Sequence, residues 1–318
     1  MKLFITGGAG FIGSNYVRHV LANSDDEVTV FDALTYAGNL SSLADVADDS
    51  RYSFVQGDIC DRNAVAAAMA GHDMVVHFAA ESHVDRSIVD PDTFVRTNCL
   101  GTNVMCDVAR NIGVERFLHI STDEVYGSIE DGSFVETDRL GPRSPYSSSK
   151  AGSDLIALSY QETYGLPVIV TRSSNNFGPF QFPEKVIPLF VTNLLDGKKV
   201  PLYGDGLNVR DWIHVLDNCA GVDTVLRKGT IGEIYNIGGG NETTNRELTS
   251  MVLSNMGVGE EMVEYVQDRL GHDRRYSIDC SKANALGWKP SRDLDVAVAE
   301  TVEWYRANRA WWEPLKAR

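Results

Sequence analysis

A glycine-rich segment near the N-terminus constrains the fold more than any other feature. The stretch "TGGAGFIG" spaces Gly7, Gly10 and Gly13 three residues apart, between the apolar run "KLFIT" and the helical pattern "FIGSNYVRHVLANS". Glycines permit a tight turn and close approach of a pyrophosphate, and the free N–H groups of a following helix N-terminus attract its charge. The spacing therefore predicts a strand, a phosphate-binding turn and a helix.

Two acidic residues follow the next predicted strands. Asp32 ends the second strand, 19 residues after Gly13, where a carboxylate accepts hydrogen bonds from an adenosine ribose and repels a 2′-phosphate. This position favours NAD over NADP. Asp58 follows the third strand, where we expect it either to hold the adenine or to cap a helix, two roles that are compatible.

Apolar runs alternate with helical patterns through the first 174 residues. Strands are predicted at 2–6, 27–32, 52–58, 74–80, 116–121 and 167–172, and helices at 11–24, 61–71, 92–113 and 145–164. Several runs are nearly continuous Val, Ile and Phe, as in strands covered on both faces. The alternation predicts an α/β fold with a doubly wound parallel sheet.

The pattern changes after residue 175. The segment 175–188 has three prolines and no clear period, so we expect an ordered loop. Further on, helices are predicted at 187–197 and 294–312, strands at 209–217 and 233–239, and a helix start at the capping box Thr244–Glu247. We expect a dinucleotide-binding domain over 1–174, completed by parts of 207–240, and a smaller α/β substrate-binding lobe over most of 175–318.

Composition narrows the class of protein. The net charge of −15 argues against nucleic acid as the main partner. The five cysteines are scattered and odd in number, which favours a reducing, cytoplasmic compartment. No signal peptide or apolar run of about 18 residues is visible, so no membrane partner is expected. The histidines form no ligand pattern with the cysteines, and we expect no metal.

Two clusters of side chains suggest proton chemistry. Tyr146 and Lys150 are four residues apart on a helix that Ser144 can cap and Pro145 can begin, so they share a face. A nearby ammonium, or a nicotinamide cation, favours the phenolate and makes Tyr146 a candidate general base. The plain alternative is a surface tyrosine and lysine.

The second cluster is "STDEVY", which follows the apolar run "RFLHI". Asp123 and Glu124 place two anions side by side at a strand end. They form either a solvated acidic turn or an acid and a base whose environments separate their pKa values.

The order of "TGGAGFIG", "STDEVYG" and "YSSSK", together with "AAESHVDRS", "SNNFGP" and "GHDRRY", resembles the extended short-chain dehydrogenase/reductases of nucleotide sugars, in particular the dTDP-glucose 4,6-dehydratases. The resemblance covers essentially the whole chain. The sequence differs from the family pattern at Ser173 and Phe177, and neither difference affects the residues expected to carry out the chemistry. The resemblance implies a Rossmann-type fold, a recycled NAD, a nucleotide-sugar substrate and a homodimer formed by the helices at 92–112 and 145–164.

The resemblance also implies roles for the clusters. Tyr146, with Lys150 beside it, takes the O4 proton as C4 is oxidised, and Thr122 binds O4. Glu124 is the base at C5, and Asp123 is the acid that protonates the leaving C6 hydroxyl. Hydride return to C6 then completes a dehydration.

Binding residues carry over by position. Further cofactor contacts are expected at Phe11, Ile12, Thr35, Ile59, Phe78, Ala79, Ala80, Thr97 and Asn176. Substrate contacts are expected at Ser82, His83, Asn175, Lys185, Val186, Pro201, Tyr203, Arg210, Asn245, Arg269 and His272, with Arg210 able to fork onto a phosphate.

Other functions stay open at this point. A nucleotide-sugar 4-epimerase or decarboxylase would leave Asp123 and Glu124 without a role. A non-catalytic dinucleotide-sensing module would need neither these acids nor Tyr146 and Lys150. UDP- or CDP-glucose could replace dTDP-glucose as the substrate.

Overall fold

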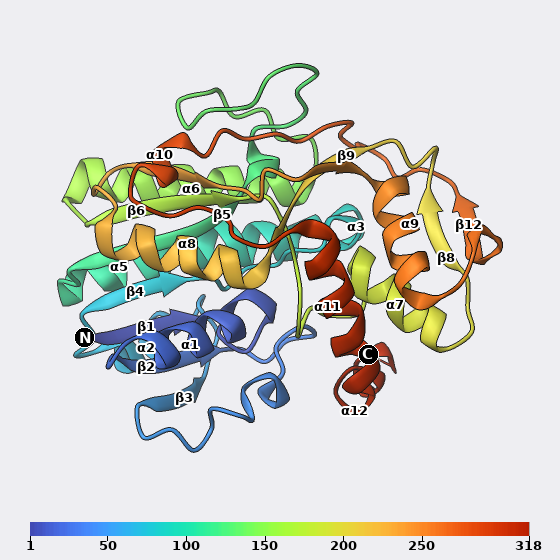
Figure 1. The fold of residues 1–318 in the computed structure, drawn as a ribbon. Coiled ribbons are helices and arrows are strands. Elements are labelled where there is room, and N and C mark those ends of the chain that lie inside the picture. Colours follow the sequence, from blue (N-terminus) through green and yellow to red (C-terminus); the bar gives the residue numbers. More distant parts are fainter. Residues whose placement is uncertain (318) are drawn as a thin grey trace.

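A seven-stranded parallel sheet forms the centre of the protein in the computed structural model, which describes residues 1–317 (Figure 1). The strand order is β10-β6-β5-β4-β1-β2-β3. The strands are β1 (Lys2–Thr6), β2 (Glu27–Asp32), β3 (Tyr52–Gln56), β4 (Met74–His77), β5 (Arg116–Thr122), β6 (Val168–Ser173) and β10 (Ile234–Ile237). Leu3 pairs with Val28 on one side and Met74 on the other, so the chain reverses its direction of winding at β1.

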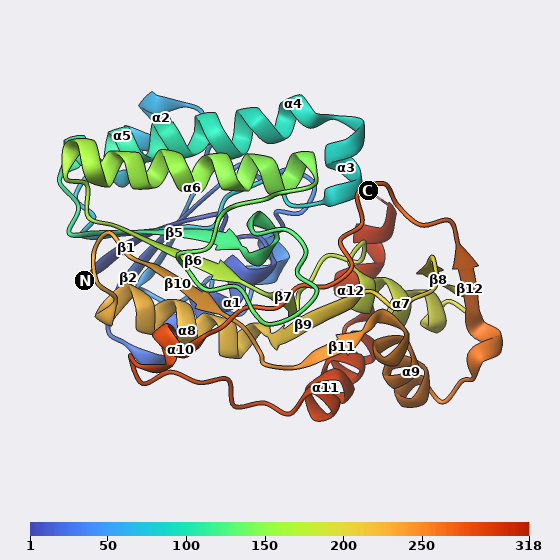
Figure 2. The ribbon, with the colours of Figure 1, turned by 90° about the horizontal axis from the view of Figure 1, so that it is seen from above.

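Helices cover both faces of this sheet (Figure 2). One face packs on α1 (Phe11–Asn23) and α8 (Val215–Lys228), and the other on α2 (Arg62–Met69), α5 (Thr102–Ile112) and α6 (Pro145–Tyr164). Alternate strand side chains feed the two cores: Leu3 and Ile5 lie on the α1 side, and Phe4 lies on the α2 side. The predicted doubly wound α/β fold is confirmed.

Local signals explain where α6 begins and ends. The Ser144 hydroxyl accepts a hydrogen bond from the Ser147 amide, and Pro145 occupies the first helical position. Gly165 ends the helix with φ of 72°, a left-handed conformation that suits glycine. The helix therefore presents Tyr146 and Lys150 from its first turns.

A smaller lobe, built from helices and two small sheets, lies on the right of Figure 1. Its helices are α7 (Val186–Leu195), α9 (Asn245–Met256), α11 (Leu294–Ala307) and α12 (Arg309–Trp312), and its strands are β7 (Asn175–Phe177), β8 (Val200–Tyr203), β9 (Val209–His214), β11 (Glu242–Thr244) and β12 (Val263–Val266). They share a core that contains Phe190, Trp212 and Trp312. The short helices α3 (Val84–Val89), α4 (Pro91–Phe94) and α10 (Ser281–Asn284) complete the fold.

Several elements differ from the sequence expectation. The predicted loop 175–188 contains β7, which pairs with β9, and the C-terminal helix is interrupted at Asn308. The predicted helix at 92–113 contains a π-helical segment, Val95–Gly101, between α4 and α5. Gly101 packs tightly there, since a Cβ on it would lie 2.4 Å from Ile59 Cδ1. Apolar residues that recur about every 3.6 positions predict an α-helix, and this spacing does not show where a π-helical turn takes in an additional residue.

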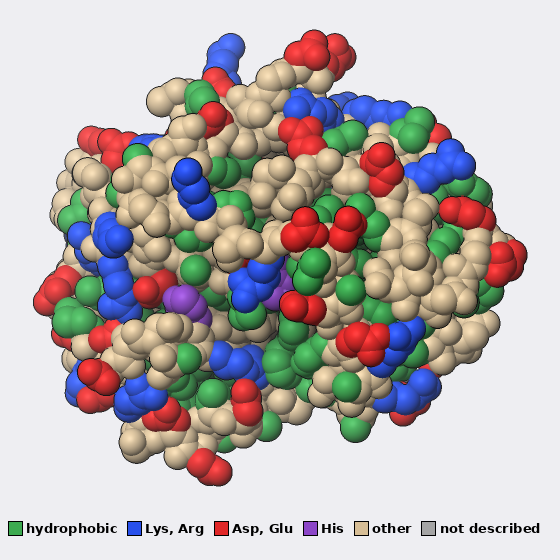
Figure 3. All heavy atoms as spheres, viewed as in Figure 1, with side chains coloured by type: hydrophobic (Ala, Val, Ile, Leu, Met, Phe, Trp, Pro, Cys, Tyr) green, Lys and Arg blue, Asp and Glu red, His purple; other side chains and the backbone are tan. Residues whose placement is uncertain are grey.

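Two observations concern the surface. Acidic, basic and apolar side chains are interspersed over the face shown in Figure 3. Within residues 1–317, no helix combines the length and apolar character that crossing a bilayer requires.

Candidate active site

The glycine turn packs against the backbone that follows β4. Gly7 has φ of +69°, and a Cβ on it would lie 2.6 Å from the Ala79 nitrogen. A Cβ on Gly13 would lie 2.2 Å from the Gly7 carbonyl oxygen. Both positions therefore require glycine, and the turn stays open toward the carboxyl ends of the strands, where ligands bind in this sheet type.

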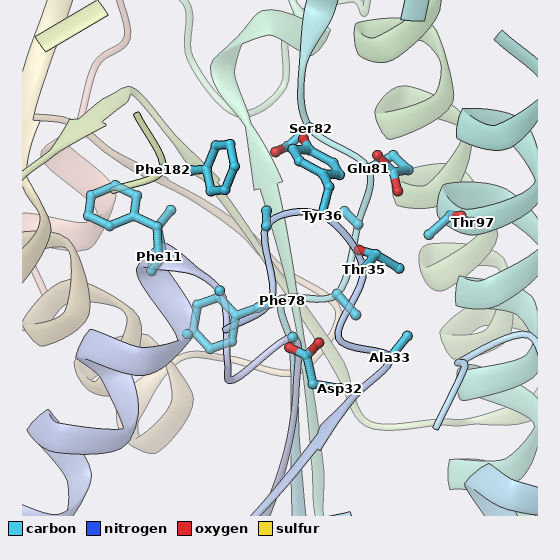
Figure 4. Close-up of a pocket in the computed structure, with 18 of the residues that line it drawn as sticks. Phe11, Asp32, Ala33, Thr35, Tyr36, Phe78, Glu81, Ser82, Thr97 and Phe182 are labelled. Atoms are coloured by element: carbon cyan, nitrogen blue, oxygen red, sulfur yellow. The ribbon is translucent and has the colours of Figure 1, made fainter. Parts of the chain in front are cut away.

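A cavity of about 290 Å³ lies at this edge of the sheet (Figure 4). It is lined by Gly7, Gly10, Phe11, Ile12, Gly13, Asp32, Thr35, Asp58, Ile59, Phe78, Ala79, Ala80, Thr97, Tyr146 and Lys150. The structure thus brings together every predicted cofactor residue except Asn176. Asp32 lies at one end, where its carboxylate accepts hydrogen bonds from the Ala9 and Leu34 amides at 3.0 and 2.8 Å. These bonds fix the carboxylate and leave it lone pairs for a ligand.

A second cavity of about 200 Å³ adjoins the first, because Gln181, Glu184 and Lys185 line both. It is lined by His83, Asn175, Asn176, Lys185, Val186, Pro201, Tyr203, Arg210, Asn245, Arg269 and His272. These are the predicted substrate residues other than Ser82 and Thr122, together with Asn176. Ser82 lies on the first cavity instead.

Tyr146 and Lys150 both face the first cavity from α6. The Lys150 ammonium donates a hydrogen bond to the Ile120 carbonyl at 2.7 Å, which holds it against β5. Burial lowers the pKa of Lys150 to about 8, against the opposing effect of Asp154. Burial, reinforced by Glu124, raises the pKa of Tyr146 well above its ordinary value.

The acidic pair occupies a 3₁₀ turn, Asp123–Val125, directly after β5. The Thr122 hydroxyl caps this turn, accepting a hydrogen bond from the Glu124 amide and donating one to Asp123 Oδ1, each at 3.2 Å. Asp123 is only 3% exposed, and its Oδ2 has no hydrogen-bond partner within residues 1–317. The expected alternative of a solvated acidic turn is therefore wrong for Asp123.

Different surroundings separate the two carboxyl groups. Burial raises the pKa of Asp123 well above its ordinary value, and the negative charges of Glu124 and Asp211 add to this effect. Burial also raises the pKa of Glu124, but Arg269, Arg210 and Lys185 oppose it. Asp123 thus holds a proton more firmly than Glu124, which suits one acid and one base.

Glu124 faces the second cavity, whereas Thr122 and Asp123 form no part of either cavity wall in the described chain. Sequence reasoning gave all three residues contact with the reacting sugar. The structure places the Asp123 carboxyl group against the Thr122 hydroxyl, which donates to Asp123 Oδ1.

Positive charge gathers on the second cavity. Arg210 on β9 is nearly buried, with its guanidinium 4.1 Å above the Tyr276 ring and bound to the Asp273 carbonyl at 2.8 Å. Arg269 and Lys185 face the same space. His272 lies beside them and pairs with Asp268 at 2.6 Å. Such a set of donors suits a diphosphate.

Sequence reasoning missed several residues that line the cavities: Tyr36, Glu81, Gln181, Phe182 and Glu184. Tyr36 follows Thr35, Glu81 precedes Ser82, and Gln181, Phe182 and Glu184 lie shortly before Lys185. These residues could thus have been predicted only from their closeness in the chain to expected contacts. Within residues 1–317, no three His, Cys, Asp or Glu side chains gather closely enough to hold a metal ion.

Comparisons with known proteins agree with this geometry. The sequence matches the family model described as GDP-mannose 4,6 dehydratase over residues 4–301. It is 60% identical to dTDP-glucose 4,6-dehydratase of Streptomyces antibioticus, across 100% of this chain and 96% of that one.

Two solved structures show how far the likeness extends. DesIV, the dTDP-glucose 4,6-dehydratase from Streptomyces venezuelae with NAD and TYD bound, is 55% identical with a TM-score of 0.98, covering 99% of this chain and 100% of that one. UDP-glucuronic acid 4-epimerase from Bacillus cereus shares the fold at 26% identity and a TM-score of 0.91, covering 96% and 99%. The identity over the full length decides between these two activities, and the chain belongs to the dTDP-glucose 4,6-dehydratase family.

Proposed function

We propose that the protein converts dTDP-glucose to dTDP-4-keto-6-deoxyglucose and water, using NAD that is regenerated in each turnover. The observation that carries this function is the separated acidic pair, Asp123 and Glu124, beside a cavity lined by Tyr146 and Lys150. An epimerase has no water to eliminate and gives such a pair no task.

The first cavity fits NAD. The glycine turn admits a pyrophosphate, Asp32 can hold a ribose, and the buried Ser121 hydroxyl on the wall has no partner within residues 1–317. When bound there, NAD would supply the acceptor for the C4 hydride and the source from which C6 receives it. The residues that hold it are the glycine turn, Asp32, Asp58 and the strand ends around Ala79.

Tyr146 and Lys150 serve the oxidation step. Tyr146 takes the proton of the O4 hydroxyl as the C4–H bond breaks and the C4 carbonyl forms. Lys150, with a pKa of about 8, is mostly an ammonium at neutral pH and stabilises the phenolate that accepts this proton. The hydrogen bond from the Lys150 ammonium to the Ile120 carbonyl holds the ammonium between α6 and β5.

Glu124 and Asp123 serve the elimination. The C4 carbonyl acidifies C5, and Glu124 removes the C5 proton. Asp123 gives its proton to the C6 hydroxyl, the C6–O bond breaks, and water leaves as the C5–C6 double bond forms. After hydride return to C6, Glu124 gives its proton back to C5. Tyr146 then holds one proton more than at the start and Asp123 one fewer, and Thr122 lies where it can pass the proton between them.

The second cavity suits the nucleoside diphosphate. Arg210 and Arg269 bind the diphosphate, and Asn245 and Tyr203 line the same cavity. We assign residues 1–174, with α8 and β10, to the NAD-binding domain, and most of 175–318 to the nucleotide-sugar lobe.

We also propose a homodimer in a reducing, cytoplasmic compartment. Large apolar side chains are exposed beside α4 and on α6, among them Val95, Leu100 and Leu155 at 55, 48 and 60%. A second copy that covers this surface removes apolar area from water. The five cysteines are all unpaired, as in reducing compartments.

The first test is to incubate the purified protein with dTDP-glucose and no added cofactor, and to analyse the products by mass spectrometry. We expect a product lighter by about 18 mass units, the loss of one water, without net reduction of NAD. Parallel reactions with UDP-glucose and CDP-glucose test which nucleotide base the enzyme accepts in its substrate. Intact dTDP-glucose even after addition of NAD would overturn the proposal.

A further inference from the structure

Arg86 on α3 joins two segments that enclose the cofactor cavity, although it lines neither cavity itself. Its guanidinium carbon lies 3.7 Å from the centre of the Tyr36 ring. Its Nε donates to Glu184 Oε2 at 3.2 Å. One side chain thus contacts the loop after β2 and the loop before α7, which are about 150 residues apart in the chain.

Aromatic contact strengthens the same junction. Tyr36 packs edge-on against Phe182 with ring centres 5.5 Å apart, and both residues line the cavity. Figure 4 shows Tyr36, Phe182 and Ser82 together at one end of the cavity, with Asp32 at the other. Lys185 closes the wall by donating a hydrogen bond to the Ser82 carbonyl at 2.9 Å.

Both loops carry backbone conformations that side chains rarely adopt. Leu34 has φ of 53° and Phe180 has φ of 67°, and within residues 1–317 no other non-glycine residue has a positive φ. Such conformations persist only where surrounding contacts enforce them. The Arg18 guanidinium carbon lies 4.0 Å from the centre of the Phe180 ring and packs against that side chain. Each strained residue lies next to the segment that Arg86 holds.

The charges around the junction favour the contact. Glu184 also lies 3.9 Å from His83, and the positive charge of Arg86 opposes the rise in the pKa of Glu81 that burial causes. Burial, with the negative charge of Glu184 close by, raises the pKa of Tyr36, so its ring stays a neutral phenol that can accept the guanidinium on its face. Arg86 therefore places a positive charge beside Glu184 and Glu81 at this end of the cavity, where Lys185 is a second cation.

We propose that Arg86, Tyr36 and Glu184 form a clasp that retains the cofactor from its reduction until its re-oxidation. This inference rests on the proposed dehydration, in which the hydride taken from C4 must stay in the site until it reaches C6. Loss of the reduced cofactor in that interval would leave a 4-keto sugar and an enzyme unable to finish. Arg86 is a positioning residue, because it acts through Tyr36 and Glu184.

The test compares Arg86→Gln with Arg309→Gln in the purified holoenzyme. Arg309 is the matched control: it pairs with Asp196 and Glu313, lies 4.9 Å from the Trp312 ring, and its side chain is 47% exposed, against 44% for Arg86. Each variant is diluted into buffer without NAD, and the NAD that remains bound is measured over time. Thermal melting with saturating NAD verifies that each variant is folded.

We expect Arg86→Gln to release NAD about tenfold faster than the wild type, since one stacking contact and one ion pair are lost. Arg309→Gln should match the wild type. Arg86→Lys should be intermediate, because it keeps the charge opposite Glu184 but not the planar stack on Tyr36. Unchanged release from folded Arg86→Gln would overturn the clasp.

A second readout follows the fate of the hydride. With dTDP-glucose and added NAD, Arg86→Gln should leak free NADH and a 4-keto sugar nucleotide that has lost no water, while the wild type leaks neither. The release measurement needs no sugar substrate. A wild-type enzyme that retains NAD but leaves dTDP-glucose intact would therefore count against the proposed function, and fast release from Arg86→Gln would still support the clasp.

Discussion

At the scale of residues, the site works because neighbouring groups of the same type meet different surroundings. The charges of Glu124 and Asp211 act on Asp123 more strongly than that of Arg210, whereas Arg269, Arg210 and Lys185 act on Glu124. Two neighbouring residues thus have different charged surroundings. The pair gives one proton and takes another in the same elimination.

The first prediction concerns Glu124. Glu124→Gln removes the base at C5 and keeps the shape of the side chain, so elimination should slow by about 10²–10⁴-fold. Oxidation at C4 should continue, and enzyme-bound NADH should accumulate as an absorbance change on mixing with dTDP-glucose. Asp123→Asn should show the same accumulation. Dehydration at the wild-type rate in Glu124→Gln would remove Glu124 from the mechanism.

The second prediction concerns the pH dependence of the oxidation. The pKa of Lys150 is lowered to about 8, so the ammonium is present below that pH and is lost as pH rises through it. The rate of C4 oxidation should therefore fall on the alkaline side, with a midpoint near that value. A Lys150→Arg variant keeps its charge, so this alkaline limb should disappear even if the overall rate is lower. An unchanged limb in Lys150→Arg would assign it to another group.

Residues with a local signal could be predicted from the sequence. The glycine turn and Asp32 depend on spacing within one strand–turn–helix unit, and the structure places them on one cavity. The clasp could not be predicted, because Tyr36, Arg86 and Glu184 meet only through the packing of three distant segments. The assignment of the second cavity came from resemblance rather than from any local pattern.

At the scale of elements, helix caps fix where a helix begins and so position the functional residues in its first turn. The Thr244 hydroxyl accepts from the Glu247 amide at 3.1 Å, and Glu247 accepts in return from the Thr244 amide at 2.8 Å. This confirms the capping box expected from the sequence. It begins α9 at Asn245, which faces the second cavity.

The third prediction tests this cap. Thr244→Ala should lower the free energy of unfolding by about 1 kcal/mol, measured by urea denaturation, because amides at the start of α9 lose their partner. The variant should also bind the nucleotide less tightly, since Asn245 is the first residue of the helix. Thr244→Ser keeps the hydroxyl and should behave as the wild type. Equal losses in both variants would show that the methyl group, and not the cap, matters.

Elements without a periodic signal were the ones that the sequence did not predict. Strand β7 has three residues and lies in a proline-rich stretch, and it forms by pairing with the distant strand β9. The π-helical turn before α5 depends on the close approach of Gly101 to Ile59, a tertiary contact. Long helices such as α6 carried both caps and were predicted with nearly correct bounds.

At the scale of the whole molecule, the chain crosses between its two parts more than once. Strand β10 adds residues 234–237 to the main sheet after the chain has formed β7, β8 and β9. The Asp217 carboxylate on α8 binds the Ser291 and Arg292 amides at 3.1 and 3.0 Å, which anchors the segment before α11. These hydrogen bonds thus join the two parts of the molecule.

The last prediction concerns assembly. If two copies meet through the helices at 92–112 and 145–164, then a charge at Leu155, which is 60% exposed on α6, would be buried without a partner in the dimer. Leu155→Arg should shift the protein from a dimer to the 35.0 kDa monomer in light scattering after size exclusion. Val296→Arg is the control, because Val296 is 58% exposed on α11, away from this surface. Tyr146 and Lys150 are buried and line the cofactor cavity, whereas Leu155 does neither, so monomeric Leu155→Arg should still bind NAD. A wild type that is monomeric at all concentrations, or a dimer that withstands Leu155→Arg, would refute this interface.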